Sequence, residues 1–213
     1  MGFMNAKPIT DPFLTRPTNR PLPNERVRWL MLAAEREMGS HGLRLVLRQA
    51  SLEAYIDHPP PANRQLGTNS AEYSRLIQAV RTYYGVGARG VLTRMGRTAF
   101  QFQLANRPLR RFVLRSSLVL LPAAARRARI LRHMAAVMSY PAANVSMHFA
   151  DQALWLVDPT ADRTLGVTSE APLCATALGE IAEALLWATG REHTVEEVVC
   201  RASGGRICRF EVL

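Results

Sequence analysis

The sequence lacks the features that would place the protein in or across a membrane. Its best apolar run, residues 117–125, is flanked by arginines and is too short to cross a bilayer. The N-terminus has no apolar segment of the kind that a secretory signal requires, and Ala6 stands where a myristoylation site carries Ser or Thr. We therefore expect a cytoplasmic protein, in a compartment where stable disulfides are rare.

Lysine is almost absent, and acidic residues are missing from the middle of the chain. Of 27 cationic residues only Lys7 is a lysine. Residues 75–150 contain 13 Arg and no Asp or Glu, whereas residues 151–213 contain ten acidic residues and five Arg. A cationic surplus of this kind attracts anionic ligands, membrane surfaces or nucleic acid. Because the sequence has no helix-turn-helix and no aromatic platform, we do not expect a nucleic-acid partner.

The arginines are densest in residues 107–132, where Arg110, Arg111 and Arg115 are our candidates for contact with an anionic group or a surface. Two functional interpretations fit this segment: an anionic head-group site beside a ligand pocket, and peripheral membrane contact through an amphipathic helix. The alternative is a solvated helix face whose Leu and Val side chains pack on the core. The sequence leaves these interpretations open.

A recognisable catalytic site is also lacking. No nucleophile motif is present, and the histidines show no metal-like pairing. Residues 85–90 spell G-x-G-x-x-G, but they follow a predicted helix rather than a strand, and no acidic residue stands near the position that would bind a ribose. The sequence therefore names no catalytic residue, and we lean against an enzyme.

The chain divides into a leader and one domain. Residues 1–22 are rich in Pro, Thr and Asn without periodicity, which is typical of a flexible leader. Residues 23–213 form a single domain, mainly helical over 23–144. Residues 91–104 fit either a helix or a strand. The other helices are predicted from Asn24 to Gly39, over 43–56, from Asn69 or Ser70 to Gly85, and over 108–140 with a division at Pro122.

The remaining part, residues 145–213, is predicted to form two hairpins joined by a helix. The helix spans 169–190 and ends at Gly190. This pattern predicts a four-stranded antiparallel sheet packed against the N-terminal helices, which is an α+β fold.

All three cysteines lie in this part. Cys174 belongs to the first turn of the predicted helix, and Cys200 and Cys208 flank the last hairpin turn on the same face. In an ideal strand Glu197 faces the other way, so it joins the cysteines only if the strand bulges. Three thiolates and one carboxylate would complete a closed zinc site. The alternatives are buried core thiols and, less favoured in a reducing compartment, a disulfide.

The run "VEEVVCRASGGRICRFEV", which follows a helix bearing one Cys, resembles the 4-vinyl reductase domain family. These are small-molecule-binding domains of bacteria and archaea, related in fold to the small subunits of the TRAPP complexes. The pattern E-x2-C-x7-C-x-F-x-V carries the resemblance, and the upstream segments "GLRLVLRQASLEAYIDHPPP" and "YYGVGARGVLTRMGR" extend it. In aromatic-sensing members four such residues bind zinc. The resemblance implies that Cys174, Glu197, Cys200 and Cys208 hold a structural zinc ion.

The resemblance also implies a hydrophobic ligand, aromatic, tetrapyrrole-like or fatty, bound between the N-terminal helices and the sheet by a sensor, carrier or accessory protein. A His and a Trp help to hold the ligand in the aromatic sensors, and here the first two predicted strands carry His148 and Trp155. Aromatic side chains suit flat apolar ligands. On that ground the further candidates are Phe149, Tyr83, Tyr84 and Phe102.

Two other functions are compatible with the resemblance. One is a vinyl reductase of the bacteriochlorophyll pathway, or its accessory factor. The other is a TRAPP-like adaptor at a membrane or protein surface. A sensor would signal as a homodimer or through a separate partner, so we count a homodimer among the expected assemblies.

Overall fold

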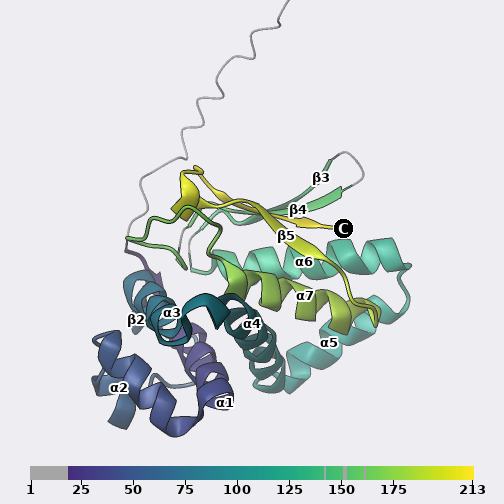
Figure 1. The fold of residues 1–213 in the computed structure, drawn as a ribbon. Helices are drawn as coiled ribbons and strands as arrows, with labels where there is room; N and C mark the ends of the chain where they lie inside the picture. Colours follow the sequence, from purple (N-terminus) through teal and green to yellow (C-terminus); the bar gives the residue numbers. More distant parts are fainter. Residues whose placement is uncertain (1–18, 142, 151–152, 161) are drawn as a thin grey trace, which may run out of the picture.

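The computed structural model describes residues 19–141, 143–150, 153–160 and 162–213, which form helices packed on one face of a four-stranded sheet (Figure 1). The predicted α+β class is confirmed. The helices are α1 (Asn24–Gln49), α2 (Ala54–Asp57), α3 (Ser70–Tyr84), α4 (Ala88–Ala105), α5 (Pro108–Val119), α6 (Ala123–Ser139) and α7 (Ala175–Thr189). The strands are β1 (Pro21–Leu22), β2 (Thr68–Asn69), β3 (Ser146–Ala150), β4 (Ala153–Asp158), β5 (Val195–Val199) and β6 (Cys208–Val212).

The sheet is built from the two predicted hairpins. Its strand order is β3-β4-β6-β5, with every neighbouring pair antiparallel, and α7 connects the hairpins. Side chains alternate between the two faces of a strand. The side chains that point toward α6 and α7 are therefore the buried ones, among them Leu154, Leu156 and Phe210. Turn residues 151–152 lie outside the described residues.

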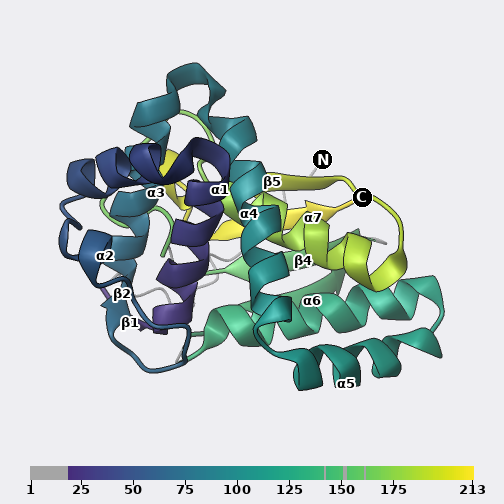
Figure 2. The same ribbon diagram turned by 90° about the horizontal axis from the view of Figure 1, so that it is seen from below.

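Helices α4 and α7 cross with their backbones in contact, and two glycines allow this approach (Figure 2). A Cβ added at Gly96 of α4 would overlap the carbonyl of Thr176 in α7. A Cβ added at Gly179 of α7 would overlap the carbonyl of Thr93 in α4. Residues 91–104, for which the sequence allowed either a helix or a strand, lie within the helix α4.

The apolar core consists of two clusters that meet at this crossing. The first is formed mainly by α1, α3 and α4. The second is formed by α5, α6, α7 and the inner face of the sheet, and it includes all three cysteines. The metal site predicted from the sequence therefore belongs to the sheet side of the molecule.

Local signals located most helix ends. Gly39, with a φ of 73°, breaks α1 into two segments, and Asn69 caps α3 in a capping box with Glu72. The bounds of two predicted helices were wrong. The helix predicted over 43–56 is interrupted, because α1 extends to Gln49 and only the short α2 follows it. The helix predicted from residue 169 begins only at Ala175, because residues 169–174 run past the sheet as a loop that bonds to the β5–β6 turn.

The predicted leader needs one correction. Residues 1–18 lie outside the described residues, but residues 19–22 are fixed, because Arg20 contacts Asp162 and Leu22 is buried in strand β1. Among the described residues no helix combines the length and the apolar character that a membrane span needs.

Candidate metal centre and ligand cavity

The four predicted zinc ligands converge at one point between α7 and the β5–β6 hairpin. Cys174 is the N-cap of α7, Glu197 lies in β5, Cys200 directly follows β5, and Cys208 begins β6. One ligand atom of each residue lies within 4.8 Å of every other. The three cysteines are each 2% exposed and Glu197 is 9% exposed, so the group is closed to solvent.

Glu197 reaches the cysteines through an irregularity in its strand. The register of β5 against β6 shifts between Glu197 and Val199, which is the signature of a β-bulge. The bulge turns the Glu197 side chain to the face that carries Cys200 and Cys208. The bulge that a four-ligand site requires in this strand is therefore present.

Hydrogen bonds hold the ligands in place but leave one acceptor unused. The backbone N–H of Cys174 donates to Glu197 Oε2 at 2.9 Å, and the N–H groups of Leu173 and Arg201 donate to the Cys200 and Cys208 sulfurs at 3.4 Å. Within the described part of the chain, buried Glu197 Oε1 has no hydrogen-bond partner. A buried acceptor without a partner costs free energy unless a cation or a proton supplies the missing interaction.

The pKa values of these four residues also favour a bound cation. Burial raises the pKa of the Glu197 carboxyl to about 7. Hydrogen bonds from Cys174 and Cys208 lower the pKa of the Cys200 thiol, while hydrogen bonding to Cys200 raises the pKa of the Cys174 thiol. Four acidic groups crowded in a buried site oppose one another's ionisation, and a bound dication would relieve this competition.

The donor set fits zinc. Three sulfurs and one carboxylate oxygen match the closed tetrahedral coordination of structural zinc, and calcium and magnesium prefer oxygen ligands instead. The ligands come from the start of α7 and from both strands of the last hairpin, so a bound ion would join these elements. We derive no chemical step from it, because all four positions are taken by protein ligands.

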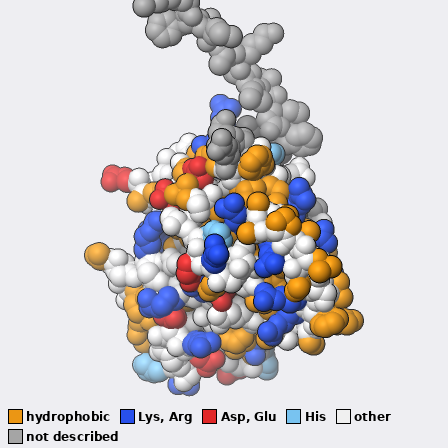
Figure 3. Space-filling model, turned by 90° about the vertical axis from the view of Figure 1, so that its right-hand side faces the viewer, with side chains coloured by type: hydrophobic (Ala, Val, Ile, Leu, Met, Phe, Trp, Pro, Cys, Tyr) orange, Lys and Arg blue, Asp and Glu red, His pale blue; other side chains and the backbone are white. Residues whose placement is uncertain are grey.

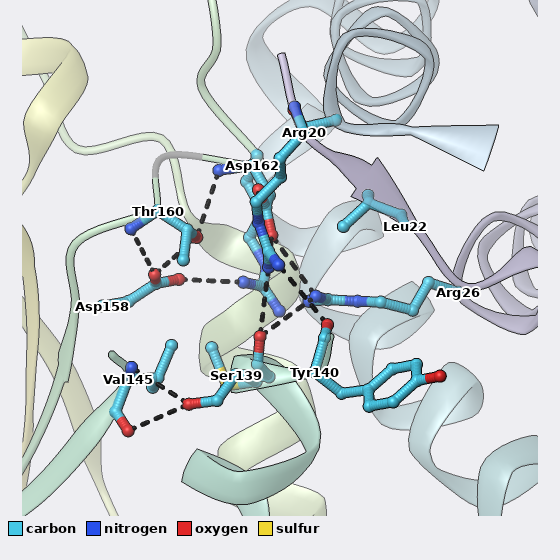
Figure 4. A network of polar contacts seen from close by, with 12 residues as sticks. Arg20, Leu22, Arg26, Ser139, Tyr140, Val145, Asp158, Thr160 and Asp162 are labelled. Atoms are coloured by element: carbon cyan, nitrogen blue, oxygen red, sulfur yellow. Dashed lines mark hydrogen bonds and ion pairs between the residues drawn. The ribbon is translucent and has the colours of Figure 1, made fainter. Parts of the chain in front are cut away.

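A second cluster of buried polar side chains ties the start of the chain to the loop after β4 (Figure 4). Arg20 donates to both carboxylate oxygens of Asp162, with Nε at 2.8 Å, and Arg26 of α1 approaches the same carboxylate at 3.3 Å. Arg20 and Arg26 also reach the carbonyl of Met138 at the end of α6. Asp162 is 1% exposed, so these ion pairs are desolvated.

Arg163, the next residue along the loop, is buried to a similar degree. Its guanidinium pairs with Glu180 of α7 at 2.6 Å and with Asp158 at 3.4 Å, and it lies over the Tyr73 ring. The Tyr73 hydroxyl donates to Glu180, and burial raises the pKa of Tyr73 to about 12. Tyr73 and Glu180 of this network also line the cavity described next.

A cavity opens between α1, α4, α5, α6 and α7. Its volume is about 70 Å³. Its apolar wall is formed by aromatic and aliphatic side chains, notably Trp29, Phe100, Leu104, Leu114, Met134 and Met138.

Charge in the cavity is strongly one-sided. The lining contains Arg26, Arg64, Arg107, Arg110 and Arg111 against two glutamates. Both glutamates are occupied: Glu25 accepts two hydrogen bonds from Arg107, and Glu180 accepts one from Arg163.

Three of these five arginines form no ion pair within the described part of the chain. Arg64 instead lies over the Tyr140 ring, 3.7 Å from its centroid. Arg110 and Arg111 make no ion pair with any residue that the structure describes, and both are exposed at the mouth of the cavity. The structure thus places two of the three arginines predicted to contact an anionic group beside the cavity. The third, Arg115, lies against Trp187 and donates to its carbonyl.

His133 of α6 faces the same space. Burial, together with the charges of Arg110, Arg129 and Arg107, lowers the pKa of this imidazole. His133 is therefore neutral near pH 7 and can donate or accept a hydrogen bond inside a cationic cavity.

The six residues predicted to hold the ligand are not among those that line this cavity. His148 and Trp155 are cross-strand partners on the sheet face opposite α6 and α7, where Arg209 stacks on Trp155. The position of Trp155 follows from strand parity, since its neighbours Leu154 and Leu156 are the buried ones. Their role in ligand binding stays a prediction.

The other predicted aromatics lie close to the helical cluster or on the surface. Phe149 and Tyr83 are exposed, and Tyr84 packs against the first core cluster and bonds to the Glu37 carbonyl. Phe102 stacks on Trp29, with ring centroids 6.2 Å apart and an interplanar angle of 26°. It therefore contacts a residue of the cavity wall without lining the cavity itself.

The sequence reasoning missed most of the cavity lining, including Trp29, Tyr73 and His133. Aromatic character alone was the criterion, and it does not indicate which helix face points inward. A signal was present in the two arginines Arg110 and Arg111, which have no acidic residue within a helical turn to pair with.

Comparison with known proteins identifies one family. The family model of the 4-vinyl reductase domain matches residues 164–213, which span α7, the hairpin β5–β6 and all four candidate metal ligands. No curated protein matches the sequence significantly.

Solved structures with a similar fold include several H-NOX proteins. An H-NOX protein from S. oneidensis, in the Fe(II)NO ligation state, has a TM-score of 0.59 at 10% identity, covering 90% of this chain and 98% of its own. An oxygen-binding H-NOX domain related to soluble guanylate cyclases has a TM-score of 0.54 at 16% identity, with 90% and 93% covered. A double variant of Tt H-NOX has a TM-score of 0.53 at 17% identity, with the same coverage. At these identities the likeness concerns the fold alone.

Proposed function

Since residues 164–213 form a domain of the 4-vinyl reductase family, we propose that the protein binds a hydrophobic small molecule carrying an anionic group. The protein would act as a sensor, carrier or accessory protein. The observation that carries the proposal is the cavity, whose wall is apolar and aromatic while Arg110 and Arg111 stand at its mouth.

The division of the lining indicates how the ligand would lie. Its flat or aliphatic part would pack on Trp29, Phe100 and Leu114, since ligand sites are mostly apolar with a few polar groups that fix orientation. Its carboxylate or similar group would meet the guanidinium groups of Arg110 and Arg111, which bind such groups in a bidentate manner. Neutral His133 would supply one hydrogen bond in the interior.

The size of the cavity restricts the ligand. Its volume is less than half of the roughly 150 Å³ of an engineered apolar cavity that accepts benzene. Even a ligand built on a single aromatic ring would therefore extend through the mouth or displace α5. This displacement is feasible, because Leu118 is the only buried residue of α5.

Zinc would have a structural part in this function. Held by Cys174, Glu197, Cys200 and Cys208, it would join the start of α7 to the last hairpin. The cavity lies on the other side of α7, where Glu180 belongs to its lining. The ion would thus fix the helix on which the cavity is built without touching the ligand.

Haem is the second candidate ligand, favoured by His133, because a histidine is a common axial ligand of haem iron. The H-NOX proteins of similar fold include structures described by their haem distortion. A porphyrin does not fit the cavity as it stands, given its volume of about 70 Å³. We therefore derive no haem chemistry for this chain. An absorption spectrum of the purified protein tests this, since bound haem would give a Soret band.

A vinyl reductase activity is less favoured. It needs a hydride donor, and the G-x-G-x-x-G run consists of the turn Gly85–Gly87 and the start of α4, so it follows the helix α3 rather than a strand.

Native mass spectrometry of the purified chain, before and after mild denaturation, tests the proposal first. We expect a mass excess of one zinc ion and, in addition, an organic species that is lost on denaturation. Its accurate mass would give the ligand class. An apo mass with three free thiols would contradict the metal assignment.

Binding can also be measured with a defined probe, 8-anilinonaphthalene-1-sulfonate, which combines flat rings with a sulfonate. We expect Arg110→Ala/Arg111→Ala to weaken its binding about tenfold, which corresponds to roughly 1.4 kcal/mol. Arg89→Ala, an exposed arginine at the start of α4, is the matched control and should bind like the wild type. Equal loss in both variants would contradict a specific anionic site at the cavity mouth.

A further inference from the structure

Helix α5 presents its apolar side to solvent. Leu109, Phe112 and Val113 are 75%, 69% and 60% exposed, and at the end of the helix Val119 and Leu120 are 58% and 91% exposed. At 100° per residue these five positions fall on one face of the helix. Only Leu114 and Leu118, on the opposite face, contact the core.

Arginines border this apolar face on both sides. On the same helical projection Arg110 lies along one edge and Arg115 along the other. Arg115 is held there by Trp187, over whose ring its guanidinium lies. No acidic residue occurs between residues 75 and 150, so α5 and its neighbours in sequence, α4 and α6, contribute no negative charge to this side.

This pattern is the reverse of an ordinary surface helix, which turns its charged side outward. Exposed apolar side chains scattered singly are common, but a contiguous patch of large ones indicates an interaction site. Figure 3 shows hydrophobic and cationic side chains adjoining one another on one face of the molecule.

We propose that α5 binds the surface of an anionic lipid bilayer, with its apolar face in the interface and its arginines at the lipid phosphates. Interfacial helices have this combination of an apolar face and cationic edges. The two bordering arginines favour a bilayer over a second copy of the chain, because two cationic surfaces repel one another. The proposal shares Arg110 with the proposed ligand site, but Leu109 and Phe112 do not line the cavity, so a test that changes these two residues separates membrane binding from ligand binding.

Co-sedimentation of the full chain with vesicles tests the proposal. We expect binding to phosphatidylcholine vesicles that contain phosphatidylglycerol, and at least about tenfold weaker binding to pure phosphatidylcholine. Binding should weaken as salt is added, because salt screens the arginine charges. The double variant Leu109→Ser/Phe112→Ser should lower binding about tenfold.

The controls make the result specific to α5. Val86→Ser replaces a fully exposed apolar residue in the turn between α3 and α4 and should bind like the wild type. Circular dichroism melting should be unchanged in both variants, because all three residues are exposed. In a Phe112→Trp variant, brominated lipid should quench fluorescence more strongly than in the wild type.

Three results would overturn the proposal. These are absence of vesicle binding, binding that the double variant leaves unchanged, and equal binding to neutral and anionic vesicles. A concentration-dependent dimer that the double variant abolishes, without vesicle binding, would assign the face to a second copy of the chain instead.

Discussion

The metal centre and the ligand cavity lie on opposite sides of α7 and are built in opposite ways. The candidate metal centre brings together four ligand atoms within 4.8 Å from residues that are all buried. The cavity is lined by five helices, and one of them, α5, has a single buried residue. The first arrangement tolerates little movement, and the second can change its volume.

This difference indicates a division of labour within one fold. A site that must accept a ligand has to open, and elements with few buried contacts open at the lowest free-energy cost. A site that only stabilises gains from being closed. Helix α7 connects the two, because its first turn adjoins the metal ligands and Glu180 reaches the cavity.

Removal of the metal should have the largest effect. We expect Cys200→Ser to abolish zinc binding and to lower the free energy of unfolding by about 5 kcal/mol or more, because metal binding energy is folding energy at such sites. Metal analysis and thermal melting measure both changes. Val198→Ser, a half-exposed neighbour in β5, should keep its zinc. Unchanged zinc content in Cys200→Ser would remove the metal site.

The buried ion pairs beside the cavity come next. Arg163→Met should lower the free energy of unfolding by about 3–5 kcal/mol, because Glu180 and Asp158 would lose their buried partner. Chemical denaturation measures this. Arg191→Met, at an exposed position, is the matched control. If both variants have the same free energy of unfolding, the buried ion pairs of Arg163 do not stabilise the fold.

The crossing of α4 and α7 should give a smaller effect. Gly96→Ala forces the two helices apart, since its Cβ would overlap the Thr176 carbonyl, and we expect a loss of about 1–3 kcal/mol. Gly90→Ala in the same helix meets only the end of the Arg94 side chain, at 3.7 Å, and should leave stability unchanged or raise it slightly. Equal melting temperatures for the two variants would contradict the close crossing.

The pH dependence of His133 should be the smallest effect, and it concerns the cavity alone. The pKa of this imidazole is lowered in the folded protein, mainly by burial, so the unfolded chain binds a proton more readily. Its contribution to stability is therefore present above about pH 6.5 and is lost as the pH falls through the folded pKa. His133→Gln should flatten the melting temperature against pH in this range. An identical slope in both proteins would show that His133 does not titrate in a cationic cavity.

The convergence of the four candidate metal ligands could be predicted from the sequence because the residues of the last hairpin follow local rules. Cys200 and Cys208 sit at equal parity around one turn, and the bulge that Glu197 requires was recognised as a condition. The four-stranded sheet was predicted for the same reason, since each hairpin is a local unit. The family resemblance supplied the choice of zinc over buried thiols.

The cavity could not be predicted in the same way, because its lining comes from helices that meet only in three dimensions. Trp29 and His133 are more than one hundred residues apart and no local pattern links them. The same limit applies to residues 91–104. The alternation of apolar and polar side chains there is compatible with a strand, but in the structure these residues lie in α4, where Gly96 packs closely against α7. Long-range packing overrides local preference at such positions.

The ion pair between Arg20 and Asp162 has a consequence for how the chain folds during synthesis. The two residues are 142 positions apart, so at ordinary translation rates the arginine waits roughly seven to thirty seconds for its partner. The first core cluster consists almost entirely of residues before 100 and can assemble earlier. We infer an order in which this helical cluster condenses first, together with β1 paired to β2. The loop at Asp162 then joins it through Arg20 only when the last third of the chain has emerged.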